Sequence, residues 1–322
     1  MTRQGVETLD AAAMASALRA DLANDDHVLA TAVPVVAHML GDQASALMRD
    51  DVIACMRGTL IAIARQLFSF AGFSEDTADL RSLESMFASN GNLVNHCYSL
   101  AVEGVINQQL SDEHGIDPAL PALLQELIES RDANISQLAM DLLASQTRFV
   151  EGQRRGGSAA LFELPPEHFD AALSVFKSWI LKRGLSCSDK LDLEIRVQYN
   201  EGVTRLSMLT RLLIAVGASA EIVTEIETAG LALFISAISK STGQPRELIA
   251  LSCQPQQSLR LAVAMKAAGR SSEAVIRQLM IAGADISLPA GFIDLEANEA
   301  FALLKTSSLG SQQDQRTVPK NG

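Results

Sequence analysis

Aromatic side chains are scarce in this sequence, at 4% of 322 residues, although apolar residues of all kinds reach 48%. Sheet-rich proteins depend on aromatic and β-branched side chains, whereas small and straight-chain residues favour close-packed helices. The sequence also lacks the alternation of polar and apolar residues that marks strands, and the strand–helix–strand rhythm of nucleotide-binding folds. These absences disfavour a dinucleotide-binding or P-loop protein and predict an all-α fold.

Clustered metal ligands are absent too. The four cysteines show no CxxC spacing, and the five histidines form no HxxxH or HExxH pair. A structural zinc site usually takes closely spaced Cys and His ligands. We therefore expect reduced, buried thiols, no metal centre and no cofactor. The residues concerned are Cys55, Cys97, Cys187 and Cys253, and His27, His38, His96, His114 and His168.

Long uninterrupted apolar runs are missing as well. The first 24 residues contain acids and polar residues throughout, unlike a secretory leader. Arg57 and Arg65 interrupt the most apolar segment, whereas a membrane span needs about 20 uninterrupted apolar residues. The sequence predicts no membrane association and a cytoplasmic location.

Lysine is absent from residues 1–156, which hold 10 Arg and 21 Asp+Glu, a net charge of −11. Residues 157–322 hold 16 Lys+Arg and 17 Asp+Glu, a net of −1, and the two parts give the −12 of the whole chain. Nucleic-acid binding needs a basic surface, so this balance disfavours it. The acidic first half is compatible with a basic protein partner, and the chain is compatible with a homo-oligomer.

Apolar periodicity and capping residues predict helices along nearly the whole chain. They are expected at residues 8–23, 26–48 (broken or kinked near Pro34), 49–71, 75–89, 92–110, 119–129, 132–155, 166–183, 188–216, 220–240, 245–252, 255–268, 271–282 and 295–305. In the second half, tight glycine junctions join successive helices, as in helical hairpins.

The segment GGSAALFELPPEHF, which begins at Gly156, is the best candidate for a domain boundary, because glycine, serine and proline cluster there. We predict two helical subdomains: an acidic N-terminal one over residues 1–156 and a C-terminal stack of helical hairpins over 157–306. The polar tail, 307–322, is expected to be disordered.

His96 shares a polar helical stripe with Ser99 and Glu103. An exposed histidine on a helical bundle is typical of phosphotransfer domains, which follow it with lysine and glycine. Here Cys97 and Tyr98 follow, so a surface histidine without a role is favoured and a phosphoacceptor is the alternative. A nucleophilic Cys97–His96 pair is disfavoured, because adjacent helical side chains point about 100° apart.

A second group of candidate residues lies at a helix end and in the second half. The candidate binding residues are Arg148, Arg154, Arg155, Tyr199, Glu201 and Arg205. The three arginines suit a solvated helix end, where bases complement the helix dipole. The alternative is that this helix docks on the second half, with Arg148 or Arg155 pairing with Glu201. Glu201 and Arg205, at i and i+4, are expected to form a solvated pair.

Several segments of the second half resemble, as an ordered set, an all-helical alphaproteobacterial family with HEAT-like repeats, a domain of unknown function. They are LAMDLLASQTRFVEGQRR, FELPPEHFDAAL, VQYNEGVTRLSMLTRLL, AGLALFISAISKSTGQPRELIALSCQ and RLAVAMKAAGRSSEAVIRQLM, within roughly residues 125–305. The resemblance implies a HEAT-like C-terminal stack and a bacterial cytoplasmic setting, and it supplies no catalytic residues. The family pattern has an apolar residue after the arginine pair, where this chain has Gly156 and Gly157.

No motif of enzyme chemistry is found, whereas helical arrays commonly bind partners on their surfaces. We therefore expect a non-enzymatic binding, scaffold or regulatory protein that recognises a protein partner through a helical surface. The alternatives are a histidine phosphotransfer protein and a helical sensor of a small molecule.

Overall fold

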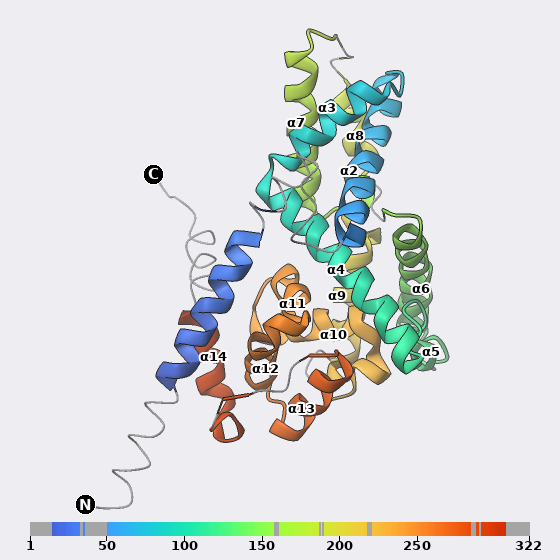
Figure 1. The fold of residues 1–322 in the computed structure, drawn as a ribbon. Coiled ribbons are helices and arrows are strands. Elements are labelled where there is room, and N and C mark those ends of the chain that lie inside the picture. The colour runs from blue at the N-terminus through green and yellow to red at the C-terminus, as the bar shows by residue number, and fades with distance from the viewer. Residues whose placement is uncertain are drawn as a thin grey trace, which may run out of the picture.

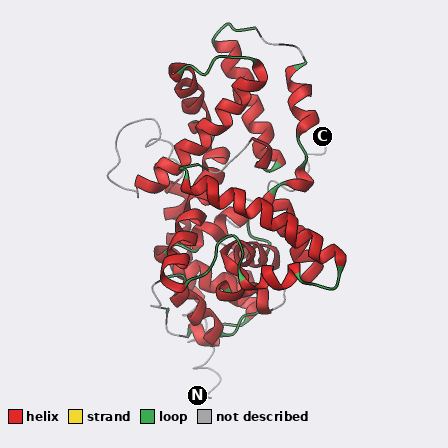
Figure 2. Cartoon of the chain, turned by 90° about the vertical axis from the view of Figure 1, so that its right-hand side faces the viewer, coloured by secondary structure: helices red, strands yellow, loops and turns green. Residues whose placement is uncertain are grey.

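The computed structural model describes residues 15–32, 35, 50–157, 161–186, 188, 190–217, 221–284, 288–289 and 291–306. All regular structure in these ranges is helical and none is a strand (Figures 1 and 2). The predicted all-α class is confirmed. The predicted disordered tail, the kink at Pro34 and Cys187 lie outside the described residues.

Most helices begin and end close to the positions that periodicity predicts. Residues 15–32 are helical and are followed by α2 (Asp50–Ala71), α3 (Thr77–Ala88), α4 (Gly91–His114), α5 (Ala122–Ile128), α6 (Ala133–Arg154), α7 (Pro166–Lys182), α8 (Leu191–Gln198), α9 (Arg205–Val216), α10 (Ile226–Thr242), α11 (Arg246–Ser252), α12 (Ser258–Ala267), α13 (Ser272–Ile281) and α14 (Ala297–Thr306). Short 3₁₀ turns lie at η1 (Leu161–Glu163), η2 (Glu201–Val203), η3 (Glu221–Thr224), η4 (Pro255–Gln257) and η5 (Phe292–Asp294).

Two predicted helices differ from the observed ones. The break expected between residues 23 and 26 is absent, because residues 15–32 form one continuous helix. The single helix expected over 188–216 is divided into α8, η2 and α9. The Asn200 side chain accepts a hydrogen bond from the backbone N–H of Gly202, and Thr204 caps α9 at Ser207. Two capping side chains thus start new helical segments where periodicity alone favours continuation.

Helix α4 is central to the arrangement of the other helices (Figure 1). It contacts α2, α3 and α7 on one side, and α10 and α11 on the other. The main hydrophobic core contains residues from the N-terminal helix through to α14. A second core joins α5 and α6 to α9 and α10. Residues on both sides of position 156 therefore contribute to each core.

A buried ion pair joins the helix over residues 15–32 to α12. Asp26 and Arg260 of α12 are 0% and 1% exposed, and Arg260 donates to the Asp26 carboxylate. The two residues are 234 positions apart in the chain. This contact joins the beginning of the described chain to its last helices.

Among the described residues, α2 is the one helix that is long and apolar enough to cross a membrane by those two criteria. However, 56% of its most apolar window is buried inside the protein. Met56, Leu60 and Leu67 are each 0% exposed in the main core. Helix α2 thus packs as a core helix against α3 and α4.

The glycines that follow α6 pack directly against α2. A Cβ atom at Gly58 would lie 1.7 Å from the carbonyl oxygen of Gly156, and one at Gly157 would lie 2.5 Å from the carbonyl carbon of Gly58. Gly156 also has a φ of +84°, which favours glycine. A side chain at position 157 would collide with the backbone of α2, and the positive φ at position 156 favours glycine, so glycine suits both positions.

This contact predicts the effect of Gly58→Ala. Alanine in a helix interior normally stabilises by about 1 kcal/mol relative to glycine. Here the added methyl group meets backbone atoms that cannot rotate away, so we expect a net loss of about 1–3 kcal/mol in the free energy of unfolding. Urea denaturation followed by circular dichroism measures the change. A gain in stability would contradict the close approach of α2 to the glycine pair.

Candidate functional site

Glu103, in the middle of α4, is fully buried and pairs with two arginines. Its carboxylate accepts hydrogen bonds from Nη1 and Nη2 of Arg246, at 3.0 and 3.1 Å, and another from Nη2 of Arg205. The side chains of Arg205 and Arg246 are 5% and 13% exposed. Three charges from α4, α9 and α11 therefore meet where little water reaches them.

Neutral groups complete the surroundings of this carboxylate. Nε of Arg205 donates to Oε1 of Gln146 in α6 at 2.7 Å, and the guanidinium lies 3.7 Å from the ring centre of Phe149. Nε of Arg246 donates to the Ser236 hydroxyl in α10 at 3.0 Å. We call Glu103, Arg205, Arg246, Gln146 and Ser236 the central polar network. It joins α4, α6, α9, α10 and α11.

Both kinds of charge in the network persist at neutral pH. Burial alone would raise the pKa of Glu103, but Arg205 and Arg246 outweigh it and hold this pKa below its usual value. Burial lowers the pKa of Arg205 to about 10, although Glu103 acts in the opposite direction. The carboxylate and the guanidinium of Arg205 are thus both ionised at neutral pH.

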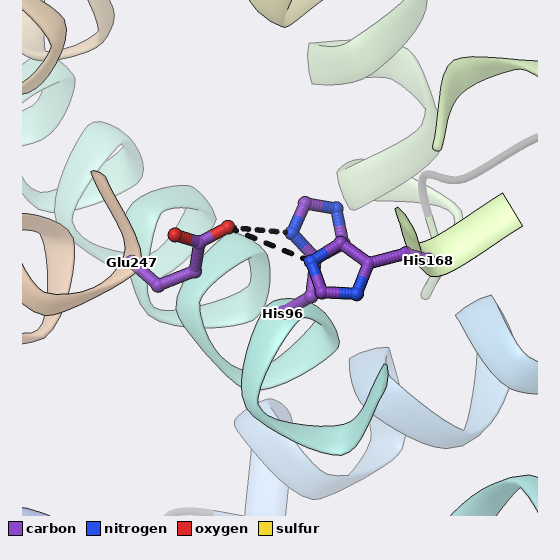
Figure 3. A group of neighbouring side chains, drawn as sticks. All are labelled: His96, His168 and Glu247. Atoms are coloured by element: carbon purple, nitrogen blue, oxygen red, sulfur yellow. Dashed lines mark hydrogen bonds and ion pairs between the residues drawn. The ribbon is translucent and has the colours of Figure 1, made fainter. Parts of the chain in front are cut away.

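A second cluster begins one residue after Arg246. Glu247 of α11, His96 of α4 and His168 of α7 point toward one another (Figure 3). Nδ1 of His96 lies 3.0 Å from Oε1 of Glu247, and Nε2 of His168 lies 3.8 Å from the same oxygen. The imidazole rings are stacked, with centres 4.4 Å apart. We call these residues the His–His–Glu cluster.

The protonation of the cluster follows from its burial. The side chains of His96, His168 and Glu247 are 2%, 7% and 21% exposed. Burial lowers the pKa of His96, against the effect of Glu247, so the ring is neutral. Burial alone would raise the pKa of Glu247, but the two imidazoles hold it well below its usual value. The cluster thus presents a carboxylate to at least one neutral imidazole.

His168 is unusual in this cluster because neither ring nitrogen has a hydrogen-bond partner, although both are buried. The nearest other carboxylate oxygen belongs to Glu167, 3.5 Å from Nε2 of His168, on a side chain that is 80% exposed. Buried polar atoms are normally satisfied, and each exception calls for an explanation.

The prediction of an exposed His96 is wrong. The polar stripe containing His96, Ser99 and Glu103 is buried in all three positions, at 2%, 1% and 0% exposure. The reason is that α4 has helices on opposite sides, so its polar face meets other polar groups instead of water. A surface phosphoacceptor at His96 is therefore not what the structure presents.

The structure separates the other candidate binding residues. Arg148 pairs with Glu163 of η1 at 3.3 Å, and both Arg154 and Arg155 pair with Glu151. The predicted pairing of Arg148 or Arg155 with Glu201 is therefore wrong. The arginine-bearing helix does contact the second half, because α6 packs against α9 in the second core, while Arg148 itself pairs with Glu163 of η1.

The expected solvated pair of Glu201 and Arg205 is also wrong. Arg205 is buried and pairs with Glu103, while Glu201 is exposed and lies in η2, outside helix α9. Tyr199 donates its hydroxyl hydrogen to the carbonyl of Leu164 at 2.9 Å and stacks on Phe169. Its position indicates a packing role between α8 and α7.

The thiols match the prediction where the structure describes them. Cys55, Cys97 and Cys253 are buried and free. Burial raises their pKa values to about 11, 12 and 12. They are protonated at neutral pH and are therefore poor nucleophiles and poor metal ligands.

An open cavity of about 620 Å³ lies between α2, α4 and α6. Val105, Phe149 and Val150 supply apolar lining, and three acids, Asp51, Asp112 and Glu113, face a single base, Arg154. Asn107 also lines the cavity, and its buried side-chain Nδ2 has no hydrogen-bond partner. Sequence reasoning gave the acidic character of this half but could not place these residues around one space.

Comparisons with protein-family models, with curated proteins and with solved structures found no match to this chain. The resemblance to the HEAT-like family therefore stays a prediction.

The central polar network predicts a large effect of Glu103→Gln. The variant leaves two buried guanidinium groups without their carboxylate, which typically costs about 3–5 kcal/mol of unfolding free energy. Because the folded pKa of Glu103 is lowered, its stabilising effect is present above its ordinary value of 4.5 and is lost as the pH falls through the folded value. Urea denaturation across this acid range measures both effects.

We expect Glu103→Gln to lower stability at neutral pH and to reduce the loss of stability on acidification. Glu126→Gln, which removes an exposed acid from α5, is the control and should change stability by no more than about 0.5 kcal/mol. If the two variants behave alike, Glu103 does not hold the helices together.

The contact between α6 and η1 predicts a coupling between Arg148 and Glu163. The side chains are 60% and 27% exposed, so a double-mutant cycle with alanine should give about 0.2–1 kcal/mol. The matched cycle of Arg148 with Glu201 should give additive changes. A larger coupling to Glu201 than to Glu163 would contradict the observed pairing.

Proposed function

We propose that this chain is a non-enzymatic binding protein that recognises a basic segment of a partner protein in the cavity between α2, α4 and α6. The observation that carries the proposal is the lining of this cavity, which combines apolar side chains, a surplus of acids and an unpaired buried amide. Each of these features matches a different part of an extended basic peptide.

The charges around the cavity favour a cation. Arg154 is already paired with Glu151, at 3.5 Å. Asp112 accepts a hydrogen bond from the side chain of Gln108, and Glu113 has no ion pair or hydrogen bond among the described residues. The carboxylates at the exposed end of α4 therefore keep acceptor capacity for an arginine or lysine of the partner.

The unpaired amide favours a peptide. Asn107 is 6% exposed, and its Nδ2 atom needs an acceptor. A backbone carbonyl supplies one, while Phe149 and Val150 offer apolar surface to the stem of a long basic side chain. The volume falls within the range of about 300–1,000 Å³ that is usual for ligand sites.

The charge distribution of the chain supports the same partner. The net charge of −11 on residues 1–156 attracts a basic molecule before contact and speeds its association. The buried thiols and the burial of His96 support a non-enzymatic role, because neither group is presented to a substrate as a nucleophile.

The test uses a labelled arginine-rich peptide and the same peptide with glutamine at each arginine. We expect the full chain to bind the first in fluorescence anisotropy, with an association rate that falls as salt is added. Asp112→Asn with Glu113→Gln should weaken binding by about 2-fold to 30-fold, since two exposed ion pairs together contribute about 0.4–2 kcal/mol and 1.4 kcal/mol is tenfold.

The matched control is Glu126→Gln with Glu129→Gln, which removes two exposed acids of the same half that do not line the cavity. This variant should bind nearly as well as the parent chain. Equal weakening by both double variants would mean that only overall charge matters, and the cavity would not be the site. Equal binding of a polyamine of the same charge would favour the small-molecule sensor instead.

A further inference from the structure

The His–His–Glu cluster is built from ligand types that transition metals prefer. Imidazole nitrogen and carboxylate oxygen are common ligands of Zn²⁺, and one such atom from each residue lies within 4.8 Å of the others. Two ligands bound to a tetrahedral zinc ion at 2.0–2.1 Å are about 3.3–3.4 Å apart. The distances of 3.0 Å from His96 and 3.8 Å from His168 to the Glu247 oxygen bracket this separation.

The charge of the cluster is not balanced by protein groups. Among the described residues, no lysine or arginine pairs with Glu247, because the neighbouring Arg246 is used by Glu103. A mostly buried carboxylate without a lysine or arginine partner is unfavourable unless another cation accompanies it. A bound metal ion supplies that positive charge.

His168 gives the second, independent observation. Both of its ring nitrogens are buried and lack a hydrogen-bond partner, and Nε2 faces the cluster. An imidazole kept only for packing would be replaced at little cost by an apolar side chain. A ring whose Nε2 faces a carboxylate, next to a second imidazole, is instead typical of a ligand.

We propose that His96, His168 and Glu247 bind one divalent transition-metal ion, most readily Zn²⁺, and that this ion fastens α4 to α7 and α11. Three protein ligands leave a fourth position, for water or for the exposed carboxylate of Glu167, which lies beside His168. The site is separate from the cavity between α2, α4 and α6 and does not depend on the function proposed for that cavity.

The first measurement uses the full chain stripped of metal with a chelator. Isothermal titration with Zn²⁺, followed by dialysis and elemental analysis, should give one ion per chain. The melting temperature should rise with added Zn²⁺, because a ligand that binds only the folded state stabilises it. Replacement of Zn²⁺ by Co²⁺ should give the visible absorption of a tetrahedral ion.

His168→Leu separates a metal ligand from a core histidine. This change removes two ring nitrogens that lack hydrogen-bond partners, but also an imidazole beside the Glu247 carboxylate, so the metal-free variant should still fold and melt cooperatively. Its affinity for Zn²⁺ should nevertheless fall at least about a hundredfold, since even the loss of an outer partner of a ligand costs tenfold to a hundredfold. Glu247→Gln is the second variant and should also lose Zn²⁺-dependent stabilisation.

The control is His114→Leu, the same substitution at the exposed end of α4, which should leave Zn²⁺ binding unchanged. The proposal would be overturned if the parent chain bound no stoichiometric Zn²⁺. It would also be overturned if His168→Leu and Glu247→Gln bound Zn²⁺ as the parent does. Loss of binding in Cys187→Ser would overturn it too, because Cys187 is not one of the three proposed ligands.

Discussion

The buried carboxylate of Glu103 is the constraint on which the arrangement of the helices depends. Hydrophobic contacts are not directional, so they allow neighbouring helices to slide or rotate with little loss of burial. A carboxylate that accepts hydrogen bonds from two guanidinium groups allows no such freedom, because removing either partner would leave a buried charge. The pairing of α4 with α9 and α11 is therefore fixed by geometry as well as by the area buried.

This constraint also explains how the central polar network and the His–His–Glu cluster are related. Arg246 turns toward Glu103, and the next residue, Glu247, lies against His96. His96 is about two turns before Glu103 on helix α4. The short helix α11 thus places Arg246 in the central polar network and Glu247 in the His–His–Glu cluster. The acid-rich first half and the nearly neutral second half meet where α4 contacts α11. Both halves therefore supply the charged side chains of these two groups.

Local periodicity predicted the helices but not the environment of their polar faces. It identified α4 and the stripe containing His96 and Glu103, because polar and apolar residues recur there with the helical period of 3.6. Whether such a stripe meets water or other protein groups depends on which helices pack over it. Those helices are formed by residues more than 100 positions away in the sequence. Arg205 shows the same limit: its sequence neighbour Glu201 suggested a local ion pair, whereas its partner, Glu103, is 102 positions earlier. The His–His–Glu cluster was missed because His96 and Glu247 are 151 positions apart.

The buried pair of Asp26 and Arg260 has a consequence for the time course of synthesis. A ribosome adds about 5–20 residues per second, so the 234 positions between the two residues correspond to roughly 10–50 seconds. During that interval the first helix has been made while its charged partner does not yet exist. Folding of this chain cannot be completed from the N-terminus onward, because its opening helix has to be held in an accessible state until one of the last helices emerges.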